Sequence, residues 1–190
     1  MDTLTAFLIG GASVAALGLA RDRLAGFSAQ RPSDYGGEPF DLRRYLNGVI
    51  DCDGVIFGPT GRVVSRFSGD FKAAWQGNHG TMREHYRYSS GATQDREWRL
   101  VMRNADRFEA TAADVIGTGQ GVVVGGAVQM RYRLRLAEDA GAHVLRVVDW
   151  MYLTPDGTIV NCSEFRKFGV VVARLSATMR SRDDRPTDHA

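Results

Sequence analysis

The chain has 190 residues, 44% of them hydrophobic, which suits one globular domain with short appendages. Its 24 basic and 22 acidic residues give a net charge of +2, whereas a dedicated nucleic-acid-binding protein concentrates a basic excess on one surface, so we expect no nucleic-acid partner. The two cysteines, Cys52 and Cys162, are too few for a disulfide scaffold and would pair only if their strands were neighbours.

An uncharged apolar segment, Leu4 to Ala20, lies near the start of the chain. As a helix its residues would rise about 25 Å, close to the lower limit for crossing a bilayer. Only Asp2 precedes the segment, whereas Arg21 and Arg23 follow it, so the positive-inside rule favours an uncleaved inner-membrane anchor with the domain on the cytoplasmic side. A signal peptide cleaved after Ala20 is the alternative. Residues 1–20 are thus predicted to be a membrane anchor or a signal segment.

Small residues in this segment would let a second transmembrane helix approach closely, although they are also common in such segments. The predicted contact stripe consists of Gly11, Ala12, Ala15 and Ala16. Residues 21–39 follow, with Pro32, Gly36, Gly37 and Pro39, and are predicted to be a linker.

The folded domain is predicted over residues 40–180. A short helix is expected from Asp41, which can cap its start, to Gly48. After Gly48 the apolar residues alternate with period two between turn signals, which predicts strands. These strands are expected near 49–57, 62–76, 80–88, 95–103, 107–115, 120–125, 127–137, 143–153, 158–168 and 170–180.

Ten strands with short links predict an all-β fold, an antiparallel meander that closes into a lipocalin-like (calycin-type) barrel. Residues 181–190 are polar and are predicted to be a disordered tail.

Alternation within the strands predicts which side chains face the barrel interior. Residues 130 to 136 place apolar side chains on one face and arginines on the other. The predicted ligand-binding interior therefore contains Trp98, Met102, Met130, Tyr132 and Leu134. The outward Arg131, Arg133 and Arg135 either form a solvated face with cross-strand acidic partners or attract anionic lipid headgroups.

Asp149 lies in the strand from Val147 to Leu153, both faces of which are largely apolar. We expect both faces to be covered, the outer one by the helix around Tyr45. A carboxylate buried there needs a partner. One interpretation pairs Asp149 with an arginine or a tyrosine; the other makes it a ligand-facing acid with a shifted pKa.

The segment Val148-Asp-Trp-Met-Tyr-Leu153, followed by Asn161 and Lys167-Phe-Gly169, resembles the DUF3833 family of bacterial putative lipoproteins of unknown function. The resemblance covers residues 40 to 178, including Arg62–Phe67, Asp114–Gly117 and Tyr132–Leu134. It implies a periplasmic side and, by association only, a connection with lipids, but no activity and no catalytic residues. No cysteine precedes Cys52, so the chain lacks a lipobox.

No catalytic, dinucleotide-binding or metal-binding motif occurs, so we expect no cofactor and no metal. Whether the protein is an enzyme stays open from the sequence, and the absence of a catalytic motif favours a function without catalysis. The function expected first is a membrane-tethered barrel that binds an apolar or amphipathic ligand, such as a membrane lipid or fatty acyl chain. The alternatives are an accessory interaction subunit of a membrane protein complex and a lipid-modifying enzyme that uses Asp149 and nearby tyrosines.

Overall fold

The computed structural model describes residues 29–182. The predicted anchor at 1–20, its stripe of small residues and most of the predicted tail lie outside the described residues. Within residues 29–182, no helix combines the length and the hydropathy needed to cross a bilayer.

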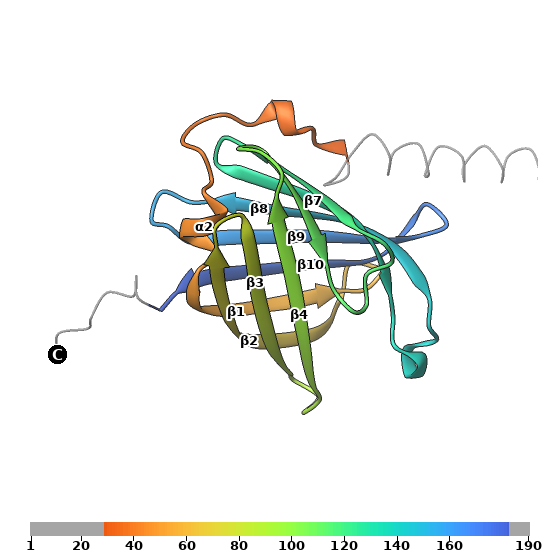
Figure 1. The fold of residues 1–190 in the computed structure, drawn as a ribbon. Coiled ribbons are helices and arrows are strands. Elements are labelled where there is room, and N and C mark those ends of the chain that lie inside the picture. The colour runs from red at the N-terminus through yellow and green to blue at the C-terminus, as the bar shows by residue number, and fades with distance from the viewer. Residues whose placement is uncertain (1–28, 183–190) are drawn as a thin grey trace, which may run out of the picture.

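Ten antiparallel strands form one closed barrel (Figure 1). Each strand pairs with the next in sequence, and β1 pairs with β10 to close the ring. The strands are β1 (Gly48–Phe57), β2 (Val63–Gln76), β3 (His79–Tyr88), β4 (Thr93–Met102), β5 (Arg107–Thr111), β6 (Gly119–Val124), β7 (Ala127–Arg135), β8 (Val144–Leu153), β9 (Ile159–Lys167) and β10 (Val170–Ser181). The predicted antiparallel barrel is confirmed, and each predicted strand corresponds to an observed one.

The strand predicted at 107–115 is too long, because β5 ends at Thr111. The chain then turns, with Val115 N donating to Ala112 O at 3.0 Å, and Val115 forms an isolated bridge with Leu134 of β7. The carbonyl oxygen of Asp114 accepts a hydrogen bond from Arg135 N at 2.8 Å. This excursion lays residues 112–116 against the end of β7 and brings Asp114 to the barrel interior.

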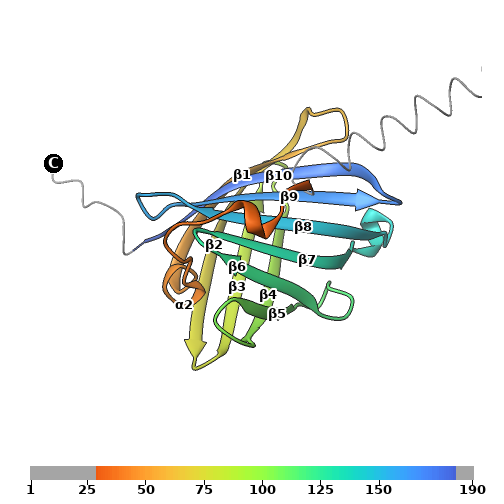
Figure 2. The ribbon, with the colours of Figure 1, turned by 90° about the horizontal axis from the view of Figure 1, so that it is seen from above.

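A short helix closes one end of the barrel. It is α2 (Leu42–Tyr45), and Asp41 caps it by accepting a hydrogen bond from Arg43 N at 2.9 Å. Leu42 and Leu46 are buried, and Trp75 Nε1 donates to Leu46 O at 2.8 Å. In an antiparallel meander, the connections after even-numbered strands share this end with α2. The connections after odd-numbered strands lie at the opposite end, which we call the open end (Figures 1 and 2).

Glycines inside the barrel make room for aromatic rings. Phe108 of β5 pairs with Gly121 of β6, and a Cβ at position 121 would lie 2.2 Å from the Phe108 ring. Only glycine therefore fits beneath this ring, which is 2% exposed and fills the narrow β5–β6 side of the interior.

Both faces of β8 are covered, as predicted, but the expected cover of the outer face is wrong. Tyr35, just after the short 3₁₀ helix η2 (Pro32–Asp34), packs on Trp150 with ring centroids 5.2 Å apart. Trp150 also stacks with Tyr152 and is 1% exposed. Tyr45 instead packs against Phe40, with ring centroids 5.5 Å apart. The segment before the barrel thus supplies the outer cover, because its aromatic side chain reaches β8.

The two cysteines are free and buried. Cys52 lies on β1 and lines the interior, whereas Cys162 lies on β9, two strands away. Because β1 and β9 are not adjacent strands, Cys52 and Cys162 do not meet the condition for forming a disulfide. Burial raises the pKa of the Cys52 thiol to about 12, with Glu84 and Asp53 acting in the same direction, so this thiol stays neutral.

Candidate functional site inside the barrel

A cavity of about 400 Å³ occupies the barrel interior. It extends from Leu42 and Leu46 beside α2 to Leu136 and Ala137 at the open end. Its volume lies within the range of small-molecule binding sites, and most of its wall is apolar. Representative apolar side chains of the wall are Phe71, Met82, Leu100, Met151, Phe165 and Leu175.

Five of the six ligand-binding residues predicted from the sequence line this cavity: Trp98, Met130, Tyr132, Leu134 and Asp149. The sixth, Met102, is 7% exposed and lies at the end of β4 beside the closed end, outside the cavity wall. Period-two alternation placed these residues inside because neighbouring side chains of a strand point to opposite faces.

Arg96 is the buried cation of the cavity. Its guanidinium carbon lies 4.1 Å from the centre of the Trp98 ring. Its Nε donates to Asp114 Oδ1 at 3.0 Å, and Nη2 lies 3.0 Å from the same oxygen. Nη2 lacks the geometry of a hydrogen bond, so this buried nitrogen has no hydrogen-bond partner among residues 29–182. The Arg96 side chain lines the cavity and is 14% exposed, so its positive charge lies within reach of a ligand, although Nη2 itself is enclosed by protein.

Glu84 lies beside Arg96, because β3 and β4 pair these two residues across the sheet. Its side chain is buried and accepts a hydrogen bond from Tyr86 OH at 2.9 Å. Burial raises the pKa of Glu84 to about 7, although the positive charge of Arg96 and the hydrogen bond from Tyr86 act in the opposite direction. The carboxyl therefore changes charge near neutral pH.

Asp149 faces the cavity from β8. Its Oδ1 accepts hydrogen bonds from Asn161 Nδ2 at 2.5 Å and from Ser163 Oγ at 2.8 Å, both on β9. The expected arginine or tyrosine partner is therefore wrong: an amide and a hydroxyl hold this carboxyl. Burial raises its pKa, while these two hydrogen bonds and the more distant Arg96 lower it.

The sequence predictions left Arg96 and Glu84 out of the site, although alternation places both inside. Arg96 stands two residues before Trp98 and shares its face, and Glu84 stands between the inward Met82 and Tyr86. Charged residues are rarely placed in a core on sequence grounds, because burying a charge is costly unless it is paired. Here Asp114 supplies the negative charge that pairs with Arg96. It lies in a segment that the alternating pattern had assigned to a strand.

The interior thus combines apolar walls with a polar cluster, defined here as Glu84, Arg96, Asp114, Asp149 and Tyr132. A molecule held there would bury its apolar part against the walls and offer its polar atoms to this cluster. Among residues 29–182, no group of three or more histidine, cysteine, aspartate or glutamate side chains is arranged to hold a metal ion.

A solved structure with a similar fold is an S-type phycobiliprotein lyase, CPES, from Guillardia theta. The two structures superpose with a TM-score of 0.55 at 9% sequence identity, covering 74% of this chain and 91% of the lyase. At this identity the similarity concerns the fold alone. No curated protein matches the sequence. The model of the DUF3833 family, described as proteins of unknown function, matches residues 22–181, and this chain belongs to that family.

Proposed function

We propose that the protein binds one amphipathic molecule inside its barrel, with an acyl chain along the apolar walls and a polar group at Arg96. The observation that carries the proposal is the largely apolar cavity of about 400 Å³ with the Arg96 guanidinium in its wall. A ligand oxygen beside the exposed part of Arg96 would accept a charge-assisted hydrogen bond, which is stronger than one between neutral groups.

The charges around Arg96 favour a neutral acceptor on the ligand. Asp114 already pairs with Arg96, and Glu84 and Asp149 add further acidic groups to the same interior. A ligand carboxylate at Arg96 would add negative charge to the polar cluster, which holds this arginine and three acids; the other arginine of the cavity wall, Arg135, is exposed. An ester, amide or alcohol oxygen would accept the hydrogen bond without this repulsion. The proposed ligand class is therefore a neutral acyl lipid rather than a free fatty acid.

The apolar segment from Leu4 to Ala20 supports a location at a membrane, where such lipids are available. We propose that this segment tethers the barrel to the inner membrane. In this arrangement the barrel exchanges its ligand with the adjacent bilayer.

Native mass spectrometry of the full-length protein, extracted in detergent, tests the proposal. We expect an adduct with the mass of one acyl lipid, and we expect a fluorescent monoacylglycerol to bind more tightly than the corresponding free fatty acid. Replacing Arg96 by glutamine should weaken monoacylglycerol binding by about tenfold or more, because a hydrogen bond to a charged group is lost. Arg99→Gln, three residues further on the same strand and facing outward, is the matched control.

A second variant covers the case in which Arg96→Gln fails to fold. Leu134 lines the cavity near the open end, and Leu134→Trp should reduce ligand binding by occupying this space. Absence of any adduct, together with equal affinity of the parent and Leu134→Trp for monoacylglycerol, would overturn the proposal.

The raised pKa of Glu84 favours a second candidate, an acid–base enzyme that acts on the bound lipid. A carboxyl with a pKa near neutrality can both accept and donate a proton at physiological pH. Incubation with monoacylglycerol, followed by mass analysis of the lipid, separates the two functions. Turnover that Glu84→Gln abolishes while binding persists supports the enzyme; an unchanged lipid supports the binding protein.

A further inference from the structure

Exposed apolar side chains collect at the open end of the barrel. Within residues 29–182, five large hydrophobic side chains are exposed: Val63, Val64, Val144, Phe168 and Val170. Val63 and Val64 begin β2, Val144 begins β8, Phe168 lies in the β9–β10 turn, and Val170 begins β10. All of these positions follow odd-numbered strands, which places them at the end opposite α2 (Figure 1). Single exposed hydrophobic residues are ordinary, but their restriction to one end of the barrel is not.

Phe168 is the most prominent member of this set, with 95% of its surface exposed. Its backbone has φ of +52°, and Gly169 follows with φ of +86°. Two positive φ values in a hairpin turn favour Asn-Gly, and a bulky residue at the first position is strained. A phenylalanine that is both strained and exposed to water contributes nothing to the barrel core. Lys167 Nζ lies 5.6 Å from its ring centroid, and the rest of the ring is free to contact another surface.

Arginines without acidic partners lie beside the open end. Arg133 of β7 and Arg146 of β8 are directly opposite each other, and Arg135 lies two residues closer to the end of β7. All three are exposed, and none forms an ion pair within the described part of the chain. With Arg131 and Arg166, Arg133 and Arg146 line a hollow of about 540 Å³ on the outer wall. Like charges placed opposite each other on a sheet destabilise it unless an anion compensates.

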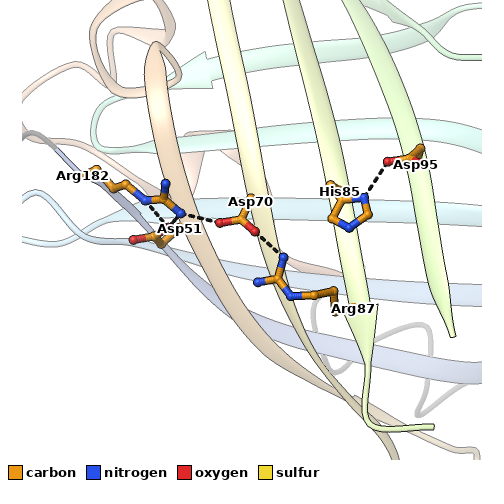
Figure 3. Close-up of polar contacts among 6 residues, drawn as sticks. All are labelled: Asp51, Asp70, His85, Arg87, Asp95 and Arg182. Atoms are coloured by element: carbon orange, nitrogen blue, oxygen red, sulfur yellow. Dashed lines mark hydrogen bonds and ion pairs between the residues drawn. The ribbon is translucent and has the colours of Figure 1, made fainter. Parts of the chain in front are cut away.

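The outer wall of β1 to β4 shows the contrasting arrangement (Figure 3). There Arg182 bridges Asp51, at 2.6 Å, and Asp70, while Arg87 also pairs with Asp70. His85 Nδ1 lies 2.7 Å from Asp95 Oδ1. Cross-strand acids thus compensate Arg87 and Arg182, whereas Arg66 and Lys72 of β2 form no ion pair among the described residues. Arg133 and Arg146 also lack such compensation, and they differ in lying directly opposite each other.

We propose that the open end of the barrel docks on an anionic membrane surface, with Phe168 inserted among the acyl chains and Arg133 and Arg146 beside the headgroups. An anionic surface would relieve the repulsion between these arginines, and the bilayer would remove Phe168 from water. A membrane accommodates separate apolar tips on several loops at once, without the shape complementarity that a protein partner needs. The cavity would then face the bilayer. Docking does not depend on what the cavity holds.

The full-length protein, reconstituted on vesicles, tests this orientation whether or not residues 4–20 anchor it. An environment-sensitive fluorophore is attached to Phe168→Cys and, in a separate sample, to Asn78→Cys in the β2–β3 turn at the closed end; both native cysteines are buried. With vesicles containing phosphatidylglycerol, we expect the label at 168 to shift to the blue and to be quenched by nitroxide lipids. With phosphatidylcholine alone, and at position 78 in either case, we expect neither effect.

Charge-removing variants test the role of the arginines. Each basic residue near an anionic surface changes binding by up to about fivefold, so Arg133→Gln with Arg146→Gln should reduce the docked fraction of the 168 label by about tenfold. Arg83→Gln with Arg99→Gln removes the same charge from the paired wall of β3 and β4 and is expected to leave docking nearly unchanged. Three results would each overturn the proposal. The label at 168 could remain in water on anionic vesicles, or its emission could shift equally on neutral vesicles. The docked fraction could also stay the same when Arg133 and Arg146 are replaced.

Discussion

At the scale of single residues, burial and hydrogen bonding act on the Asp149 carboxyl in opposite directions. Two donors on β9 hold Oδ1, while burial raises the pKa. An asparagine at this position keeps an oxygen for both donors and removes the buried charge. We therefore predict that Asp149→Asn unfolds at a temperature equal to or above that of the parent at pH 8, measured by circular dichroism.

Asp149→Ala is the comparison for this prediction. It removes the acceptor that Ser163 Oγ uses and should lower the free energy of unfolding by about 1–3 kcal/mol. If Asp149→Asn were destabilised as much as Asp149→Ala, the negative charge itself would be stabilising, and the hydrogen bonds from Asn161 and Ser163 would not explain how this carboxyl is held.

Glu84 predicts how stability depends on pH. Its pKa is raised from 4.5 to about 7 in the folded protein, so the folded state binds this proton more tightly than the unfolded state. The proton's contribution to stability is present below pH 4.5 and is lost as the pH rises to about 7. Glu84→Gln mimics the protonated form. Urea unfolding should find it close to the parent at pH 5 and more stable at pH 8, by up to about 3 kcal/mol.

Glu97 supplies the control for Glu84→Gln, because hydrogen bonds from Arg83 and Arg99 lower its pKa on the outer wall. Its charge state does not change between pH 5 and pH 8. The difference between Glu97→Gln and the parent should therefore be the same at both pH values. A parent whose stability rises from pH 5 to pH 8, with Glu84→Gln showing the same rise, would contradict the assignment to Glu84.

At the scale of elements, one buried carboxylate joins β9 to β10 on the outer face of the barrel. Glu164 is 0% exposed, lies 2.7 Å from Arg166 Nη2 on its own strand and accepts from Arg174 Nε on β10 at 3.3 Å. Removing one member of a buried ion pair leaves the other charge without its partner, which costs about 3–5 kcal/mol. We predict a loss of this size for Glu164→Ala in urea unfolding.

Glu109→Ala is the matched control for Glu164→Ala. Glu109 pairs with Arg103 across β4 and β5, but both side chains contact water. Solvent weakens such a pair, so its loss should be much smaller. Equal losses for the two variants would show that burial does not set the strength of the Glu164 pair.

Strand prediction succeeded where one face of a strand is apolar and the other polar, as in residues 130 to 135 of β7. A shift of one residue in the strand register would exchange the two faces, so the pattern allows few alternative registers. It failed after Thr111, where Ala112 to Val115 continue the apolar pattern although the chain turns away to bridge Leu134. Alternation describes burial and not pairing, so a buried segment outside the sheet carries the same pattern.

At the scale of the whole molecule, the net charge of +2 conceals a separation of charges. Arg87 and Arg182 on the wall of β1 to β4 pair with acids (Figure 3), whereas the exposed Arg133 and Arg146 have no acidic partner among the described residues. Composition sums over both walls and therefore does not reveal the basic side. Strand register decides this separation, because it determines which side chains lie opposite each other.

The sequence by itself determined the all-β architecture and which side chains face the interior, because both depend on the local two-residue period of a strand. Only the tertiary structure decided which residues each buried side chain contacts. Asp149 meets Asn161 and Ser163, and Trp150 is covered by Tyr35, which lies far before it in the chain. These contacts join strands or segments that are separate in the chain. The energy of placing a buried charge or ring depends on all of its neighbours, and these are assembled only when the barrel closes.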